Sequence, residues 1–389
     1  MRPVGHFGAR PIRLAWSAIV FPSLALNYAG QAATVLADGV TTDNIFYRLC
    51  PTPLLMPMIV LATIATVIAS QSIITGAFSM TRQAIQLGRF PRLKITQTSA
   101  EGYGQIYVGP VNWMLMVVTI ALTIGFGKSD NLAAAYGIAV SATMLMTSTL
   151  LLIAMREIWQ WSLPASIGVA GIFLVIDAAF FVSNSLKIVE GGYVPLLLAG
   201  AVYTIMYIWH RGADAITERI HETLIPLDTF MAKLKQDRVP RVPGTAVFLT
   251  RATRDTPPVL VWHVRHNRAL QQHVLAITTV TESVPWIADE MRATVTQAAP
   301  NFWRAIAHYG FMERPDIPHL LGQLKKRGCL ADVTYFVGHE TVTRRQDGKG
   351  LPAWQEALFA VMERNAAHVT DFFNLPGEQV VEIGRQISI

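Results

Sequence analysis

Long apolar runs dominate the first half of the chain and alternate with short polar or basic stretches. Six of these runs are long enough, or nearly so, for a helix to cross a hydrocarbon core of about 30 Å. Because a backbone in lipid must satisfy its own hydrogen bonds, each run predicts a membrane-spanning helix. The predicted spans are 14–37, 54–80, 111–126, 132–155, 163–183 and 193–209.

The second predicted span differs from the others because it carries hydroxyl side chains on two sides. A helix turns by about 100° per residue, which separates its hydroxyls into two groups. Thr63, Thr66 and Ser70 lie on one side, and Ser72, Thr75 and Ser79 lie roughly opposite. A span with two polar faces is contacted by protein or water on both, so we expect it inside a helix bundle. The pattern leaves open whether the hydroxyls line a polar pathway or serve tight helix packing.

Beyond about residue 210 the pattern changes to shorter helical and β-branched runs with more charge. Strands are predicted at 246–250, 259–264, 274–280, 333–337 and 380–383, and helices at 213–235, 318–326 and 354–365. This alternation predicts a compact α/β domain. We therefore expect a transmembrane domain over 1–210, followed by a cytoplasmic α/β domain over 211–389.

Composition agrees with the membrane class. The 389 residues are 52% hydrophobic and only 15% charged, with a mean hydropathy of +0.36. The net charge of +6 is a common consequence of basic cytoplasmic loops, and no nucleic-acid recognition motif accompanies it. We therefore expect membrane lipid as a partner and no nucleic acid.

Basic residues in the flanks of the spans orient the chain, because Lys and Arg accumulate on cytoplasmic loops. One side carries Arg2, Arg10, Arg13, Arg82, Arg89, Arg92, Lys94, Arg156 and Arg211, and the other carries Arg48, Lys128 and Lys187. This asymmetry places both termini in the cytoplasm.

Few residues carry chemistry beyond packing. Asp177 is an acidic residue inside a predicted span, where a carboxylate is costly unless paired or hydrated, so it is a candidate for proton or ion handling as well as for a structural role. His263 and His266, three apart on a predicted strand, face opposite sides and do not predict one metal site, even with His273 nearby. Cys50 and Cys329 do not predict a disulfide. No catalytic motif is present, so we do not expect an enzyme or a cofactor.

Several collinear motifs resemble a known family. They are GHFG at 5–8, LNYAGQ at 26–31, ASQSIITGAFSMTRQAIQLGRFPR at 69–92, GQIYVGPVNW at 104–113, LAAAYGIAVSATM at 132–144, GGYVPLLLA at 191–199, HYGFMERPDIPHLL at 308–321, TYFVGHET at 334–341 and FFNLP at 372–376. These stretches span nearly the whole chain and resemble the KUP/HAK/KT potassium uptake permeases.

The resemblance implies a helical bundle similar to LeuT-like transporters of the APC type, with potassium and protons as partners in symport across the bacterial inner membrane. Family members carry some six helices before the GHFG motif, so the six spans here correspond to the second half of that fold. The resemblance therefore implies a truncated permease, inactive or weakly active alone, whose partner is a missing N-terminal half or a second copy in a homodimer.

Within that resemblance, Gln71, Ser72, Thr75 and Ser79 are the expected neighbours of the ion pathway. No metal is expected beyond the transported potassium. Two other interpretations stay open. The chain could be a non-transporting, membrane-anchored regulatory protein with a sensory cytosolic domain, or its substrate could be another cation or an amino acid.

Overall fold

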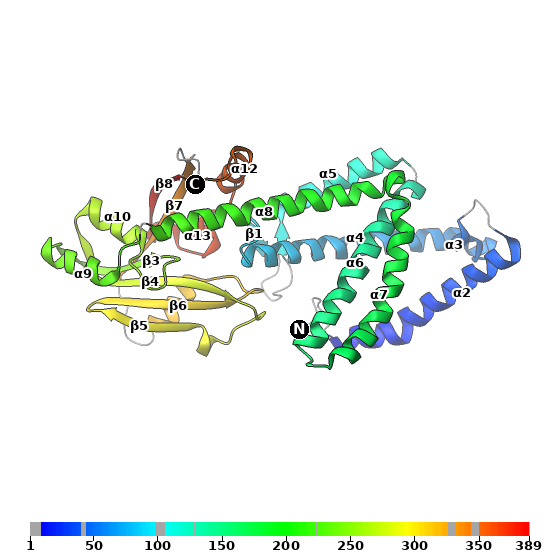
Figure 1. The fold of residues 1–389 in the computed structure, drawn as a ribbon, viewed down its shortest axis with the longest axis horizontal. Coiled ribbons are helices and arrows are strands. Elements are labelled where there is room, and N and C mark those ends of the chain that lie inside the picture. The colour runs from blue at the N-terminus through cyan, green and yellow to red at the C-terminus, as the bar shows by residue number, and fades with distance from the viewer. Residues whose placement is uncertain are drawn as a thin grey trace.

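The computed structural model describes residues 9–39, 44–97, 106–127, 129–222, 224–325, 332–343 and 350–388. Long helices occupy one end of the molecule and a sheet with shorter helices occupies the other (Figure 1). Helix α8 (Tyr193–Glu222) runs from the first region into the second. The expected order, apolar helices followed by a part with a sheet, is confirmed.

Within the described residues, six helices are long and apolar enough to cross a membrane, as expected from the sequence. They are Arg10–Ala37, Thr52–Gln86, Gly109–Phe126, Leu132–Glu157, Leu163–Ser185 and Ile188–Glu222. The second and the last of these continue well beyond the apolar runs. Their extra turns carry polar residues into the region of the sheet.

The first two spans lie toward the N-terminus and are joined by a short helix, α3 (Ile45–Arg48). The first consists of α1 (Ala9–Ala15), a π-helical turn (Trp16–Val20) and α2 (Phe21–Asp38). Pro22 stands in the first turn of α2, just after the wide turn, and a proline has no N–H to donate to the preceding turn. After a 3₁₀ turn (Thr52–Leu54), the second span is the long helix α4 (Leu55–Gln86).

The remaining spans follow a small antiparallel pair, β1 (Ile95–Gln97) and β2 (Ile106–Val108). They are α5 (Gly109–Phe126), α6 (Ser129–Glu157), α7 (Leu163–Ser185) and α8, the last preceded by a π-helical turn, η3 (Ile188–Gly192).

Helices α6 and α7 run side by side as a hairpin (Figure 1). A β-carbon on Gly137 would lie 2.4 Å from Asn184 Oδ1, and one on Gly192 would lie 2.0 Å from Ile138 Cδ1. A side chain at either position would force Asn184 or Ile138 to move, because α7 and η3 approach α6 closely. Small residues thus stand at the contact, at Gly137 and at Ser141, which is buried.

The second region is built on a six-stranded sheet in the order β5-β6-β4-β3-β7-β8. The strands are β3 (Arg241–Leu249), β4 (Leu270–Glu282), β5 (Ala293–Ala299), β6 (Phe302–Gly310), β7 (Val333–Thr343) and β8 (Val380–Ser388). All neighbours pair in parallel except β5 with β6.

Helices cover both faces of this sheet, as parallel strands with apolar residues on both sides require. They are α9 (Leu227–Gln236), α10 (Pro258–Asn267), α11 (Ile317–Lys325), α12 (Ala353–Arg364) and α13 (Val369–Phe372), with 3₁₀ turns at Asp289–Met291 and Gly377–Gln379. Val247 points into a core shared with α11 and the start of α13, and Phe248 points into the opposite core under α9 and α10.

Three sequence expectations for this region were wrong. The run 259–264 is helix α10, not a strand, because Pro257 and Pro258 stand where a helix begins and cannot donate to a sheet ladder. The helix expected over 213–235 is interrupted, since α8 ends at Glu222 and α9 starts after Pro226. Strands β5 and β6 were not predicted.

Two other expectations are only partly covered by the structure. Cys50 is a free thiol, whereas Cys329 lies outside the described residues. Among the basic residues used for orientation, Arg2 and Lys128 also lie outside them.

Candidate functional site

The candidate site is the contact between α6 and α7 around Asp177. This carboxylate is only 5% exposed, and its Oδ2 accepts a hydrogen bond of 2.5 Å from Ser148 Oγ. Ser148 is also buried. Asp177, the one acidic residue singled out from the sequence, is thus held between two apolar helices by a partner that the sequence analysis did not name.

An open groove of about 480 Å³ runs beside this pair. Its lining residues all belong to α6 and α7: Tyr136, Ala139, Val140, Thr143, Met144, Thr147, Ser148, Phe173 and Asp177. Thr143 and Thr147 donate their hydroxyl protons to the carbonyls of Ala139 and Thr143, each at 2.8 Å. Their oxygen lone pairs stay available as acceptors for a ligand in the groove.

The surroundings of the Asp177 carboxylate supply a hydroxyl partner rather than a basic one. Within the described part of the chain, no Lys, Arg or His pairs with it, and Ser148 is its hydrogen-bonding partner. A buried ionised carboxylate without a counter-charge is costly, so a bound cation or a proton would stabilise this arrangement. The groove therefore offers one acid and several hydroxyls to a small cation.

The polar residues of α4 are placed differently. Ser72, Thr75 and Ser79 donate to the carbonyls of Ile68, Gln71 and Thr75 on their own helix, at 3.2, 2.9 and 3.0 Å. Gln71, Ser72 and Thr75 are exposed, and Ser79 is half-buried. None of them lines the groove beside Asp177, so the structure does not bring the two sets of candidate residues together.

The hydroxyls on the opposite side of α4 also bond to carbonyls of their own helix. Thr63, Thr66 and Ser70 bond to the carbonyls of Ile59, Ala62 and Val67, each at 2.8 Å. No described residue buries the most apolar stretch of α4, which is exposed along most of its length. This differs from the expectation of a span enclosed on both sides. Because Ser and Thr bond to carbonyls of the preceding turn, their hydroxyls stay satisfied while this part of α4 is uncovered.

The C-terminal end of α4 is buried and connects to the second region. Phe78 packs with Ile106, Val108 and Val111 of β2 and α5. Gln86 Nε2 donates to the carbonyl of Glu313 at 2.9 Å. The helix that carries the predicted pathway residues is thus joined to the sheet region by a buried hydrogen bond.

Further contacts join the regions through Arg92 and through α8. The Arg92 carbonyl accepts from the Ala367 N–H at 2.5 Å, and the Arg92 guanidinium lies 5.7 Å from the centre of the Phe372 ring. On α8, the Trp209 ring lies 5.3 Å from Phe359 of α12, and a β-carbon on Gly212 would lie 2.2 Å from the same phenylalanine.

The histidines considered from the sequence do not form a site. His263 is buried against Phe248 and Phe336, and burial lowers its pKa, so it stays neutral in an aromatic core. His266 stacks on Trp262, and His273 lies beside Trp303. The strand argument used for His263 and His266 fails because both lie on helix α10.

Comparison with known proteins places the chain in a family. Residues 2–214 match the K+ potassium transporter integral membrane domain, and residues 243–389 match the K+ potassium transporter C-terminal domain. The chain belongs to the K+ potassium transporter family. That family consists of transporters and not enzymes, and with the six apolar helices it identifies a multi-pass plasma-membrane protein.

Individual relatives agree with the family models. The chain is 68% identical over 390 residues to the "Probable potassium transport system protein Kup 1" of Bradyrhizobium sp. (strain ORS 278). It is 51% identical over 389 residues to the "Probable potassium transport system protein Kup 3" of Legionella pneumophila (strain Lens). Each match covers 99% of this chain and 62% of the relative, so the chain spans less than two thirds of the length of these curated relatives.

Proposed function

We propose that this protein takes part in potassium uptake across a bacterial inner membrane, with both termini in the cytoplasm. Family membership, the names of relatives at 51% to 68% identity, and the basic flanks of the spans support the proposal. The observation that carries it is Asp177, a buried carboxylate beside a hydroxyl-lined groove with no cationic partner among the described residues.

Asp177 is the proposed coupling group of a potassium:proton symport. In a low-dielectric site the charged form of a carboxylate is costly, so either a proton or a nearby cation stabilises it. Hydroxyl oxygens such as those of Thr143 and Thr147 suit a weakly hydrated monovalent ion that must bind loosely enough to leave. Proton and potassium would then compensate the same charge at different stages.

Helix α4 is proposed to form one wall of the pathway, in the second half of a LeuT-like fold. Gln71, Ser72, Thr75 and Ser79 are the pathway residues in this proposal. The exposure of this polar face supports a role for helices beyond the 389 residues, supplied by an N-terminal half like that of a full-length relative or by a second copy. Alone, the chain is expected to transport poorly.

Potassium uptake into a host that lacks its own uptake systems tests the proposal. The chain is expressed by itself and together with the N-terminal part of the Bradyrhizobium relative, and initial uptake rates at low external potassium are compared. We expect substantial uptake only in the paired arm, with acidification of the cytosol accompanying potassium entry. Equal rates in both arms would contradict the need for a partner, and no uptake in either would contradict transport.

Substitutions in the paired arm test the groove. We expect Asp177→Asn to lower the uptake rate at least about tenfold. Such a loss corresponds to about 1.4 kcal/mol or more of interaction between the carboxylate and the transported ion or proton. Ser148→Ala removes the donor that orients Asp177 and should shift the pH dependence of uptake. The matched control is Ser166→Ala in α7, since Ser166 is fully buried and, among the described residues, its hydroxyl donates to the carbonyl of Ser162 in the preceding turn.

The alternative function, a non-transporting regulatory protein anchored in the membrane, has no specific observation in its favour. It would be supported if this chain bound other potassium transport proteins while every substitution in its groove left uptake in the paired arm unchanged.

A further inference from the structure

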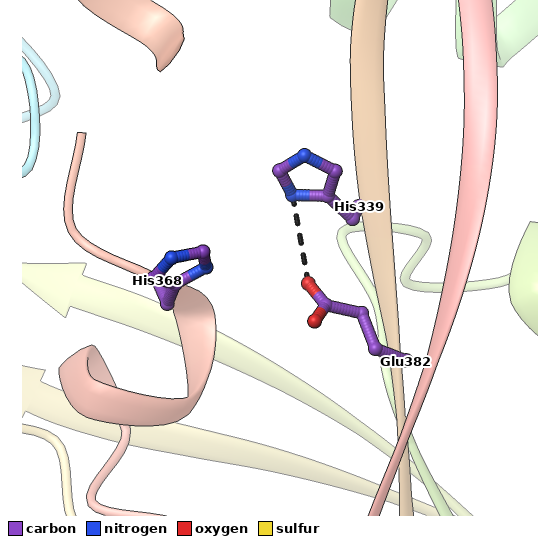
Figure 2. Close-up of side chains that lie close together, drawn as sticks. All are labelled: His339, His368 and Glu382. Atoms are coloured by element: carbon purple, nitrogen blue, oxygen red, sulfur yellow. Dashed lines mark ion pairs between the residues drawn. The ribbon is translucent and has the colours of Figure 1, made fainter. Parts of the chain in front are cut away.

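Three potential metal ligands meet on the sheet region, far from the groove between α6 and α7. They are His339 of β7, Glu382 of β8 and His368, which immediately precedes α13. One ligand atom from each residue lies within 4.8 Å of those of the other two. Figure 2 shows His339 and Glu382 pointing toward each other from neighbouring strands, with His368 beside them at the start of α13. The His339 Nδ1 to Glu382 Oε1 distance is 3.5 Å.

The fold explains why these residues converge. Strands β7 and β8 are parallel and His339 pairs with Gly384, so Glu382, two residues earlier, shares a face of the sheet with Gly384 and His339. Val337 lies on that same face and is fully buried in a core with Val369 and Phe373, which flank or belong to α13. This packing holds the backbone of both strands and of α13 beneath the three side chains.

The donor set selects a class of ion. Imidazole nitrogen with carboxylate oxygen suits Zn²⁺ and related first-row transition metals, whereas Mg²⁺ and Ca²⁺ prefer oxygen ligands alone. Metal–ligand bonds of about 2.0–2.2 Å hold neighbouring ligand atoms roughly 3–4 Å apart, so small rotamer changes would close the cluster. The His339 and Glu382 side chains are 43% and 42% exposed, which lets an ion enter from water and keep a water ligand.

A second His–Glu pair in the same sheet shows what a simple ion pair looks like. His308 Nδ1 lies 2.8 Å from Glu282 Oε1, closer than His339 lies to Glu382. Among the described residues, however, no third ligand joins His308 and Glu282, and only His339, His368 and Glu382 form a group of three. The wider spacing of His339 and Glu382, with a second imidazole beside them, leaves room for an ion between the three.

We propose that His339, His368 and Glu382 bind one divalent transition-metal ion of the zinc class. The ion would join β7 and β8 to the segment that leads into α13. Ala367, next to His368, donates its N–H to the carbonyl of Arg92, in the segment that follows α4. Metal binding therefore steadies the contact between the sheet region and the segment after α4. This inference does not depend on potassium transport by the chain.

Metal titration of the full chain in detergent tests the site. The protein is first stripped with a chelator, and Zn²⁺ affinity is then measured by competition with a chromophoric chelator. Variants are His339→Ala, His368→Ala and Glu382→Gln, with His308→Ala as the matched control. We expect each ligand variant to weaken zinc binding at least about tenfold, since even outer-shell changes cost metal sites that much. The control should bind as the unchanged chain does, and excess Mg²⁺ should not compete.

Folding defects are separated from ligand loss by two further measurements. Co²⁺ replaces Zn²⁺ as a spectroscopic probe, and its visible absorption should appear in the unchanged chain and in His308→Ala but not in Glu382→Gln, whose side chain keeps its shape. Hydrogen exchange at the Ala367 amide should slow with zinc in the unchanged chain and in His308→Ala, but not in the three ligand variants. Zinc affinity that is equal in all variants, or lowered as much by His308→Ala, would overturn the site. If exchange at the Ala367 amide does not change when zinc binds, the proposed link between the metal site and the segment after α4 is wrong.

Discussion

Two isoleucines show how differently the two regions of this protein are built. Ile124 in α5 is 76% exposed, whereas Ile277 in β4 is 1% exposed. The sheet region buries its apolar side chains within itself, and the long helices present theirs outward. The difference follows from the surroundings, since lipid tails solvate isoleucine as well as a protein core does and water does not.

Polar groups show the same contrast. Hydroxyls of α4 bond to carbonyls of their own helix, such as Thr66 to Ala62. In the sheet region, Glu313 is buried and accepts from the N–H groups of Gly310 and Ile287 at 2.6 and 3.2 Å and from Arg292 at 2.8 Å. The hydroxyls of α4 are thus satisfied locally, whereas buried polar groups of the sheet region such as Glu313 are also satisfied by residues more distant in the chain. Four measurements can challenge the contrast between the two regions.

The largest expected effect comes from emptying the sheet core. Phe248 is fully buried and its ring stacks on Phe336 at 4.8 Å. Phe248→Ala should lower the free energy of unfolding of the sheet region by about 3–5 kcal/mol. Pulse proteolysis of the detergent-solubilised chain across a urea series measures this change. The matched substitution Ile124→Ala should leave the same transition within about 0.5 kcal/mol, and an equal loss from both would remove the contrast.

The next effect depends on pH. Burial raises the pKa of the Tyr309 hydroxyl to about 12 from its ordinary value of 10.0. Above pH 10 the unfolded chain loses this proton while the folded chain keeps it, so stability should fall as pH rises from about 10 to 12. The contribution is about 2–3 kcal/mol. Unfolding experiments over this range should show a weaker pH dependence for Tyr309→Phe. If the pH dependence of the unfolding free energy is the same in Tyr309→Phe, other groups cause the loss of stability at alkaline pH.

A smaller effect is expected at the turn between α7 and α8. Gly191 adopts φ of +141°, a conformation that L side chains rarely take. Gly191→Ala should cost about 1–3 kcal/mol, measured as a lower thermal unfolding temperature in detergent. Gly168 in α7 has open space where a β-carbon would stand, so Gly168→Ala should be neutral or slightly stabilising. If both substitutions destabilise equally, helix packing and not backbone strain controls this region.

The smallest expected effect concerns the hydroxyl side chains of α4. Thr66→Val removes a hydroxyl that bonds only to its own helix, so thermal stability should change by about 0.6 kcal/mol or less. Thr75→Val should be equally mild for stability, yet it should slow potassium uptake in the paired assay if Thr75 faces the pathway. A large stability loss from either would mean that another helix packs against that face.

The sequence predicted the helical region better than the sheet region, for a physical reason. Crossing lipid demands a run of apolar residues of fixed length, which is a local property, and all six runs became helices. The run 259–264 carries β-branched residues as a strand does, but its placement above the sheet, with Leu260 and His263 buried, suits a helix. Strands β5 and β6 pair with each other across a short turn, but β5 is an edge strand exposed along most of its length, so it lacks the apolar pattern that marks a buried strand.

The candidate site was also only half predictable. An acidic residue within an apolar run marked Asp177, because charge in lipid is costly wherever it stands. Its partner Ser148 lies on another helix, and the hydroxyls at Thr143 and Thr147 matter only because α6 faces α7. A serine- and threonine-rich face in the span preceding Asp177 was the available signal.

By itself, then, the sequence determined six apolar helices, the order of the two regions, the family and one intramembrane acid. Each depends on composition or on residues close together in the chain. Only the tertiary structure decided that Asp177 meets Ser148, that α4 keeps its polar faces exposed, and that His339, His368 and Glu382 converge. Such contacts join residues distant in sequence, and the free energy that selects them comes from packing whole helices and strands together.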